Sequence, residues 1–144
     1  MNETIQLLQD VVRNARTGLD AVEQLMRRSQ GGDMRGELAR EREGYMAVKR
    51  DGERALDDAG ARPEPAGPMA KAGMWLGLEA ETLTDRSDAH LAEIGIPGAT
   101  MGVIEMTKSL NTYDDADPRA RGLASRFVVQ QNDTIDRQKG FLEN

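Results

Sequence analysis

Four long segments of the sequence carry apolar or small residues at alternating spacings of three and four, and this pattern constrains the fold more than any other feature. Residues at these spacings share one face of an α-helix, so each segment is expected to form a helix with one buried stripe. The first stripe consists of Ile5, Leu8, Val12, Ala15, Leu19, Val22 and Met26. A flanking row consists of Leu7, Val11, Gly18 and Leu25. Together they are wider than a two-stranded coiled-coil seam, which favours a helical bundle. The helix is expected to end at Gly31 and Gly32.

The second segment is expected to begin after a cap at Asp33 and to end at Gly60. Its stripe consists of Met34, Leu38, Glu41, Tyr45, Val48, Gly52, Ala55 and Ala59. One position of this stripe is therefore a carboxylate, Glu41. Residues 61–68 contain three prolines, which predicts a non-helical connector after the helix.

The third segment is expected to form a helix from about residue 79 to residue 110. Its stripe consists of Leu83, Ser87, His90, Ile94, Thr100, Val103, Thr107 and Leu110. Pro97 lacks a backbone donor and crowds the preceding turn, so we expect a kink or a break near it. A short extra helix is expected before this segment, over residues 68–78, where Trp75 would close one end of the apolar interior.

The fourth segment follows a predicted turn over residues 111–118, with Asp117 placed to cap the helix and Pro118 at its first position. Its stripe consists of Ala124, Val128, Gln131, Ile135, Gln138 and Leu142, with Leu123, Phe127 and Phe141 beside it. No segment shows the alternation typical of a strand. We therefore predict an all-α fold, an antiparallel four-helix bundle that forms a single domain over residues 1–144.

The composition agrees with a helical bundle and argues against several functions. Aromatic residues make up 3% of the chain, so the core must be mainly aliphatic. A net charge of -6, from 19 basic and 25 acidic residues, argues against nucleic-acid binding. The absence of cysteine excludes disulfides, thiolate metal sites and a cysteine nucleophile. Because the sequence shows neither a signal peptide nor a membrane-spanning pattern, we expect a cytoplasmic protein without a membrane partner.

Three stretches carry a resemblance to a known family: GPMAK at 67–71, SDAHLAE at 87–93 and GATMG at 98–102. With these stretches, and with carboxylates on its predicted stripes, the chain resembles a group of small, uncharacterised bacterial ferritin-like proteins over nearly its whole length. The resemblance implies a ferritin-like four-helix bundle and adds little about activity.

The ligand pattern of ferritin-like metal sites indicates which residues of this chain are candidate metal ligands. Di-iron members usually contribute one glutamate from each of two helices and a Glu-x-x-His pair from each of the other two. This chain departs from that pattern, because its single histidine, His90, comes before Glu93 in the reversed order, and Glu41 is followed at the third position by Gly44. The candidate metal ligands are Glu41, His90 and Glu93, with iron, manganese or zinc as the candidate metals, and no catalytic residue is identified.

Glu41 and His90 each have a structural explanation beside the metal one. A buried carboxylate is costly unless it has a partner, and His90, Tyr45, Gln131, an arginine or a metal ion could each provide one. His90 is expected on a buried row, where a carboxylate or a tyrosine hydroxyl would satisfy it as well as a metal. We expect Glu41 and His90 to pair with each other.

Three functions stay open on this basis. The first is a non-enzymatic ferritin-like bundle with a degenerate metal site, which acts by self-association as a homodimer or by binding another protein. The alternative is a metal-binding or redox protein that uses Glu41, His90 and Glu93. The third is a small-ligand carrier with a pocket under Trp75. Hydrolase, kinase and dehydrogenase motifs are absent from the sequence.

Overall fold

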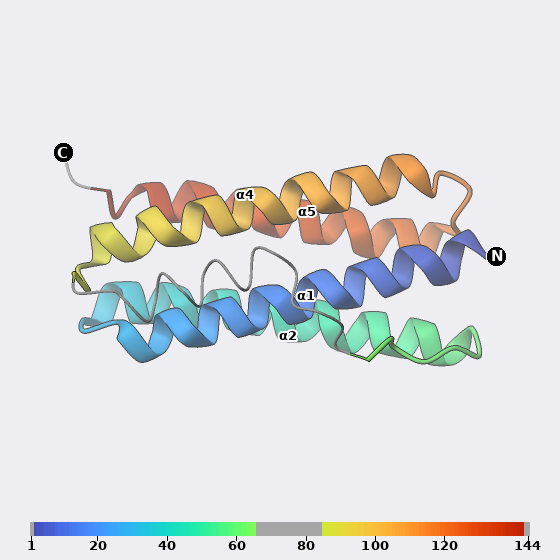
Figure 1. Cartoon of the computed structure of the whole chain (residues 1–144), viewed down its shortest axis with the longest axis horizontal. Coiled ribbons are helices and arrows are strands. Elements are labelled where there is room, and N and C mark those ends of the chain that lie inside the picture. The colour runs from blue at the N-terminus through green and yellow to red at the C-terminus, as the bar shows by residue number, and fades with distance from the viewer. Residues whose placement is uncertain (1, 66–84, 143–144) are drawn as a thin grey trace.

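The computed structural model describes residues 2–65 and 85–142 of the chain. Four long helices lie side by side in an elongated bundle (Figure 1): α1 (Glu3–Arg28), α2 (Gly32–Asp58), α4 (Asp88–Thr112) and α5 (Pro118–Lys139). The described residues contain no strand, and none of these helices has a stretch long and apolar enough to cross a membrane. The predicted all-α four-helix bundle is confirmed.

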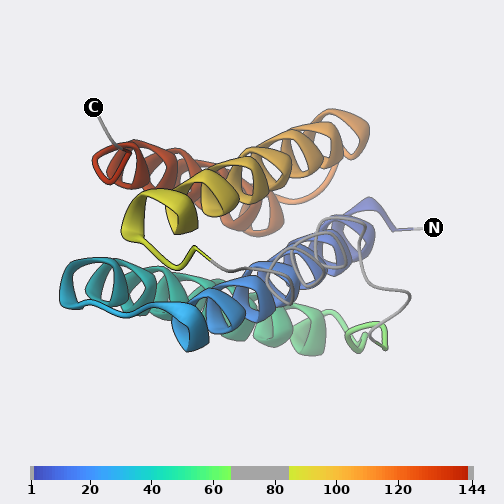
Figure 2. The same cartoon turned by 60° about the vertical axis from the view of Figure 1, so that its left-hand side comes forward.

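The helices form two antiparallel hairpins that face each other. Residues 29–31 join α1 to α2, residues 113–117 join α4 to α5, and packing is most extensive within each hairpin. Between the hairpins, α1 lies against α4 and α2 against α5. Figure 2 shows the hairpins as two layers. The contact between the layers is less extensive than the contact within each hairpin. How completely the space between the layers is filled therefore depends on the side chains that face it.

Burial follows the predicted stripes on α2 and α5, and follows that of α1 with a small rotation. The predicted stripe of α4 is wrong, because Ile94 is its only described member that is buried, and Thr100 and Thr107 are exposed. The buried residues of α1 are Leu7, Leu8, Val11, Val12, Ala15, Val22 and Leu25. Ile5, Leu19 and Met26 are only partly buried, so the buried face lies between the predicted stripe and its flanking row. The polar stripe positions Glu41, Gln131 and Gln138 are 5%, 2% and 1% exposed. A carboxyl group and two amides therefore lie inside the bundle.

Two predicted helix-end signals, Asp117 and Gly60, are confirmed, but the end of α1 and the start of α2 differ from the prediction. Helix α1 ends at Arg28 with Ser29 at its C-cap, before the two glycines predicted to end it. Asp117 accepts a hydrogen bond from the backbone N–H of Ala120 at 2.8 Å, and Gly60 adopts a φ of 75° after α2, as expected. The predicted cap at Asp33 is wrong, because α2 begins at Gly32 and Gly31 occupies the cap position. Asp33 lies in the first turn, where its charge interacts favourably with the helix dipole.

The third long helix begins later than predicted and continues through its proline. Residues 85–87 are not helical, and the Ser87 side chain caps α4 by accepting a hydrogen bond from the backbone N–H of His90 at 3.3 Å. No break occurs at Pro97, which lies with Glu93 on an exposed face where water can bond to the carbonyl that lacks its donor. The predicted short helix over residues 68–78, including Trp75, lies outside the described residues.

Candidate functional site

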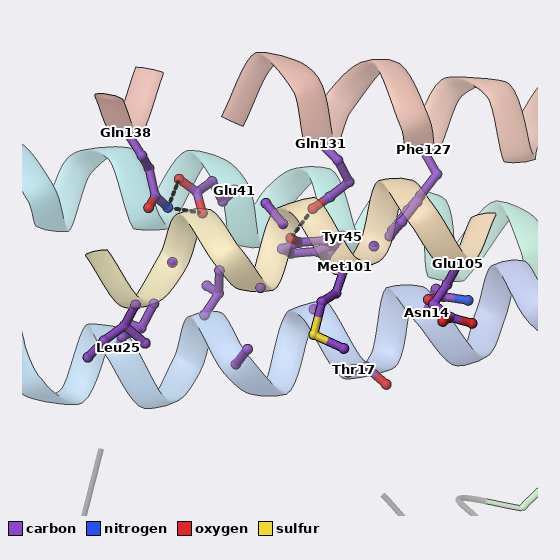
Figure 3. A pocket seen from close by; sticks show the side chains of 18 of the residues that line it. Asn14, Thr17, Leu25, Glu41, Tyr45, Met101, Glu105, Phe127, Gln131 and Gln138 are labelled. Atoms are coloured by element: carbon purple, nitrogen blue, oxygen red, sulfur yellow. Dashed lines mark hydrogen bonds between the residues drawn. The ribbon is translucent and has the colours of Figure 1, made fainter. Parts of the chain in front are cut away.

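A cavity of about 310 Å³ lies between the two hairpins. Residues of α1 and α4 form its sides, while α2 and α5 contribute polar side chains from the interior of the bundle (Figure 3). Most of the lining is apolar or small, and the buried polar groups are Glu41, Tyr45, Gln131 and Gln138. This combination is typical of a small-molecule pocket, in which a few polar groups orient an otherwise apolar ligand.

Glycines on α4 create much of this space. Gly95, Gly98 and Gly102 recur on one face of the helix and line the cavity. A Cβ atom on Gly98 would meet no heavy atom within 4 Å, whereas one on Gly95 would collide with the amide of Gln138. Gly98 therefore borders open space, while Gly95 allows Gln138 to reach the interior. The sequence signal for this wall is the three-four spacing of the glycines around Pro97.

Glu41 lies in the interior with Gln138 as its hydrogen-bond partner. The Gln138 Nε2 group donates to both carboxyl oxygens, Oε1 at 3.0 Å and Oε2 at 2.9 Å. Burial and the neighbouring Glu37 raise the pKa of Glu41 to about 9, although the Gln138 bond acts in the opposite direction. At neutral pH the Glu41 side chain is therefore a neutral carboxylic acid.

Arg137, which directly precedes Gln138 in the chain, is already paired. Arg137 Nε donates to both oxygens of Glu37, at 2.9 and 3.0 Å, and the Glu37 side chain is 7% exposed. Arg137 lowers the pKa of Glu41 through its charge, but this effect is smaller than that of burial. Glu41 therefore lies beside this ion pair, and its hydrogen bond with the Glu37 side chain favours the protonated form of Glu41.

Gln138 has one satisfied and one unsatisfied end. Its Nε2 atom bonds to Glu41, whereas its Oε1 atom is buried and has no hydrogen-bond partner among the described residues. Figure 3 shows this oxygen turned away from the Glu41 carboxyl group. A buried acceptor without a donor is destabilising, so the group is either a functional feature or a cost that the fold carries.

A second hydrogen bond joins α2 to α5 near the same cavity. The Tyr45 hydroxyl donates to Gln131 Oε1 at 2.8 Å, and the burial of the phenol raises its pKa. The Tyr45 and Phe127 rings have centroids 6.1 Å apart and planes inclined at 47°. Glu41, Tyr45 and Gln131 also line a smaller hollow of about 190 Å³. The Glu41–Gln138 and Tyr45–Gln131 pairs thus form a polar layer between the cavity and this smaller hollow.

The structure places the three predicted metal ligands in different surroundings. His90 Nδ1 lies 3.6 Å from Glu93 Oε1, and their side chains are 33% and 62% exposed, whereas Glu41 is buried and bonds to Gln138. The sequence predicts His90 as the partner of Glu41, whereas in the structure that partner is Gln138, which the sequence predicts on a buried stripe. The proposed metal site with iron, manganese or zinc stays a prediction.

An acidic group elsewhere brings ligand atoms closer together. Among the described residues, Glu3, Asp114 and Asp115 place three carboxylate oxygens within 4.8 Å of one another. Glu3 Oε1 also accepts a hydrogen bond from the Asp115 backbone N–H at 3.0 Å, which connects α1 to the turn after α4. Two of the three residues are exposed, and exposed acidic groups are common in proteins without a metal.

Comparison with known proteins supports the fold. No family model matches the chain, and no curated protein matches it. The chain is similar to a solved DUF305 fragment from Deinococcus radiodurans. The two share 20% sequence identity with a TM-score of 0.76, over 97% of this chain and 95% of the other. At this identity the similarity concerns the helical fold alone, so function must be argued from the cavity.

Proposed function

We propose that this chain is a non-enzymatic binding protein that holds a small molecule in the cavity between its hairpins. The observation that carries the proposal is the cavity itself, about 310 Å³ of mainly apolar space with Glu41 and Gln138 in its wall. Pockets of this size are large enough to bury most of a small organic ligand. The buried polar groups would orient one end of the ligand, and the apolar wall would hold the rest.

The chemistry of the lining supports binding over catalysis. The described residues that line the cavity include no histidine, serine or lysine. Glu41 is held by an amide, and the Tyr45 hydroxyl donates to Gln131, so neither is arranged beside an activated nucleophile. Ligand binding needs only the shape and the hydrogen-bonding groups that these residues provide.

A substitution at Gly98 tests the proposal directly. Gly98→Leu should project a side chain into the cavity without a clash, because a Cβ atom there meets nothing within 4 Å. The matched control is Gly122→Leu on α5, which also has open space around its Cβ atom but does not line the cavity. Both changes remove a helix glycine and should raise stability by about 0.5–1 kcal/mol.

The probe for this test is 1-hexanol, a neutral molecule with an apolar chain and a hydroxyl group. We expect saturation-transfer NMR and titration calorimetry to detect binding to the native chain and to Gly122→Leu. Gly98→Leu should bind at least about tenfold more weakly, a loss of about 1.4 kcal/mol. Equal binding by all three chains would place the probe outside the cavity, and no binding by the native chain would reject the proposal.

Self-association is a second candidate function, favoured by exposed apolar side chains on α4. Met101 and Ile104 are 39% and 49% exposed and lie three positions apart on this helix. Neighbouring apolar side chains on one helix face are typical of a contact between protein chains. A homodimer through α4 would cover them, and the oligomeric state in solution tests this candidate.

The metal-binding or redox alternative needs Glu41, His90 and Glu93 to come together. Elemental analysis of protein purified without a chelating tag should distinguish it from a degenerate site. Stoichiometric iron, manganese or zinc that is lost in both Glu41→Gln and His90→Ala would support the alternative. Absence of bound metal would leave the cavity as the candidate site.

A further inference from the structure

We propose that the cavity selects an organic cation, an apolar body that carries a primary or secondary ammonium group, which donates hydrogen bonds to Glu41 and to Oε1 of Gln138. This inference rests on the proposed ligand-binding function and specifies its ligand class. Three independent features support it: the hydrogen-bonding groups of the wall, its charges and its aromatic rings.

The cavity wall contains a buried hydrogen-bond acceptor that has no donor. Gln138 Oε1 has no partner among the described residues, the Glu41 oxygens accept from Gln138 Nε2, and the Tyr45 hydroxyl donates its proton to Gln131. The Gln138 residue is only 1% exposed, so leaving this oxygen without a donor is costly. A ligand that donates N–H bonds would satisfy the acceptor that the protein leaves open.

The charges around the cavity favour a cation. Among the described residues that line it, Glu105 and Glu41 are carboxylic, with Glu41 in its neutral form, and Arg13 is the one basic residue. Arg13 Nη2 bonds to Asp10, and Arg137, the basic residue beside Glu41, bonds to Glu37. Both cations are therefore already paired with carboxylates. An ammonium group beside Glu41 would favour the ionised carboxylate and form a charge-assisted hydrogen bond with it.

Aromatic rings in the wall agree with the same ligand class. Tyr45 and Phe127 both line the cavity, and both are less than a tenth exposed. A cation over the face of an aromatic ring is attracted by the ring quadrupole, and the attraction increases when water is excluded. The face of such a ring carries the negative part of the quadrupole and would repel an anion.

A matched set of probes tests the inference: hexylammonium, 1-hexanol, hexanoate and hexyltrimethylammonium. Calorimetry at neutral pH should show hexylammonium binding at least about tenfold more tightly than 1-hexanol, and hexanoate binding most weakly. Hexyltrimethylammonium carries the same charge without N–H donors. It should bind more weakly than hexylammonium, because it cannot satisfy Gln138 Oε1.

Two variants assign the preference to Glu41. Glu41→Gln keeps the shape of the side chain but removes its ability to ionise, and Glu43→Gln removes a carboxylate from an exposed position of the same helix. We expect Glu41→Gln to lose the preference for hexylammonium over 1-hexanol but still to bind 1-hexanol. Binding of 1-hexanol would show that the cavity of the variant is folded. Glu43→Gln should behave as the native chain does.

The outcomes separate this inference from the function on which it rests. Binding of 1-hexanol without a preference for hexylammonium would overturn the cation inference and leave the ligand-binding proposal in place. Tighter binding of hexanoate, or an unchanged preference in Glu41→Gln, would also overturn it. If no probe binds to the native chain, both proposals fail.

Discussion

Glu41 should make the stability of the fold depend on pH. Its pKa is about 9 in the folded chain against an ordinary value of 4.5, so the folded state keeps a proton that the unfolded chain releases above about pH 4.5. This contribution to stability is complete below that pH and is lost as the pH rises to about 9, at up to about 1.4 kcal/mol per unit. Urea unfolding at pH 5 and pH 8 measures it.

Glu41→Gln isolates this contribution from the other titrating groups. The variant should lose less stability than the native chain between pH 5 and pH 8, because its side chain stays neutral in both states. Parallel stability curves for the two chains would contradict the buried, protonated state of Glu41.

The pair between Glu41 and Gln138 should show coupling in a double-mutant cycle. Gln138→Leu removes the amide that bonds to the buried carboxyl group and should cost about 1–3 kcal/mol. Adding Glu41→Leu should recover much of that loss, since neither group is then left without its partner. His90→Ala is the control, expected within about 0.5 kcal/mol of the native chain because its side chain is 33% exposed. Strong coupling of Glu41 to His90 instead would restore the pair predicted from the sequence.

Helices α1 and α2 approach each other closely at Gly18. A Cβ atom on Gly18 would collide with the ring of Tyr45, whereas one on Gly36 would meet nothing within 4 Å. Gly18→Ala should therefore cost about 1–3 kcal/mol, because a buried ring cannot move without disturbing its neighbours. Gly36→Ala should raise stability by about 0.5–1 kcal/mol through helix propensity alone. Urea denaturation measures both, and a stabilised Gly18→Ala variant would contradict the close approach.

The whole molecule is expected to form a homodimer, and α4 offers a surface for it. Light scattering at high micromolar concentration should give the mass of two chains. Ile104→Glu should reduce the measured mass to that of one chain, because burying an unpaired carboxylate in the contact is unfavourable. Val129→Glu on α5, where the native side chain is 58% exposed, should leave the dimer intact. A native monomer at this concentration would reject the prediction.

Local patterns in the sequence were sufficient to predict the four helices and most of the buried faces of α1, α2 and α5, but not the buried face of α4. The three-four spacing, the cap at Asp117 and the glycine at position 60 depend on residues within one or two turns of each other, so they can be recognised without the rest of the fold. The same patterns placed Glu41, Gln131 and Gln138 on buried stripes. Asp33 was wrongly predicted as a cap because the cap lies two residues earlier, at Gly31, a glycine that offers no side-chain signal.

Only the tertiary structure decided which of these buried polar groups meet. Glu41 and Gln138 are 97 positions apart in the chain, and their contact depends on how far α2 and α5 are rotated and shifted along each other. An apolar stripe determines which face of a helix is buried, but not that rotation or shift. The open space beside Gly98 has the same origin, because it depends on where α1 lies relative to α4. The cavity is therefore a property of the packed helices, formed where the two hairpins do not fill the space between them.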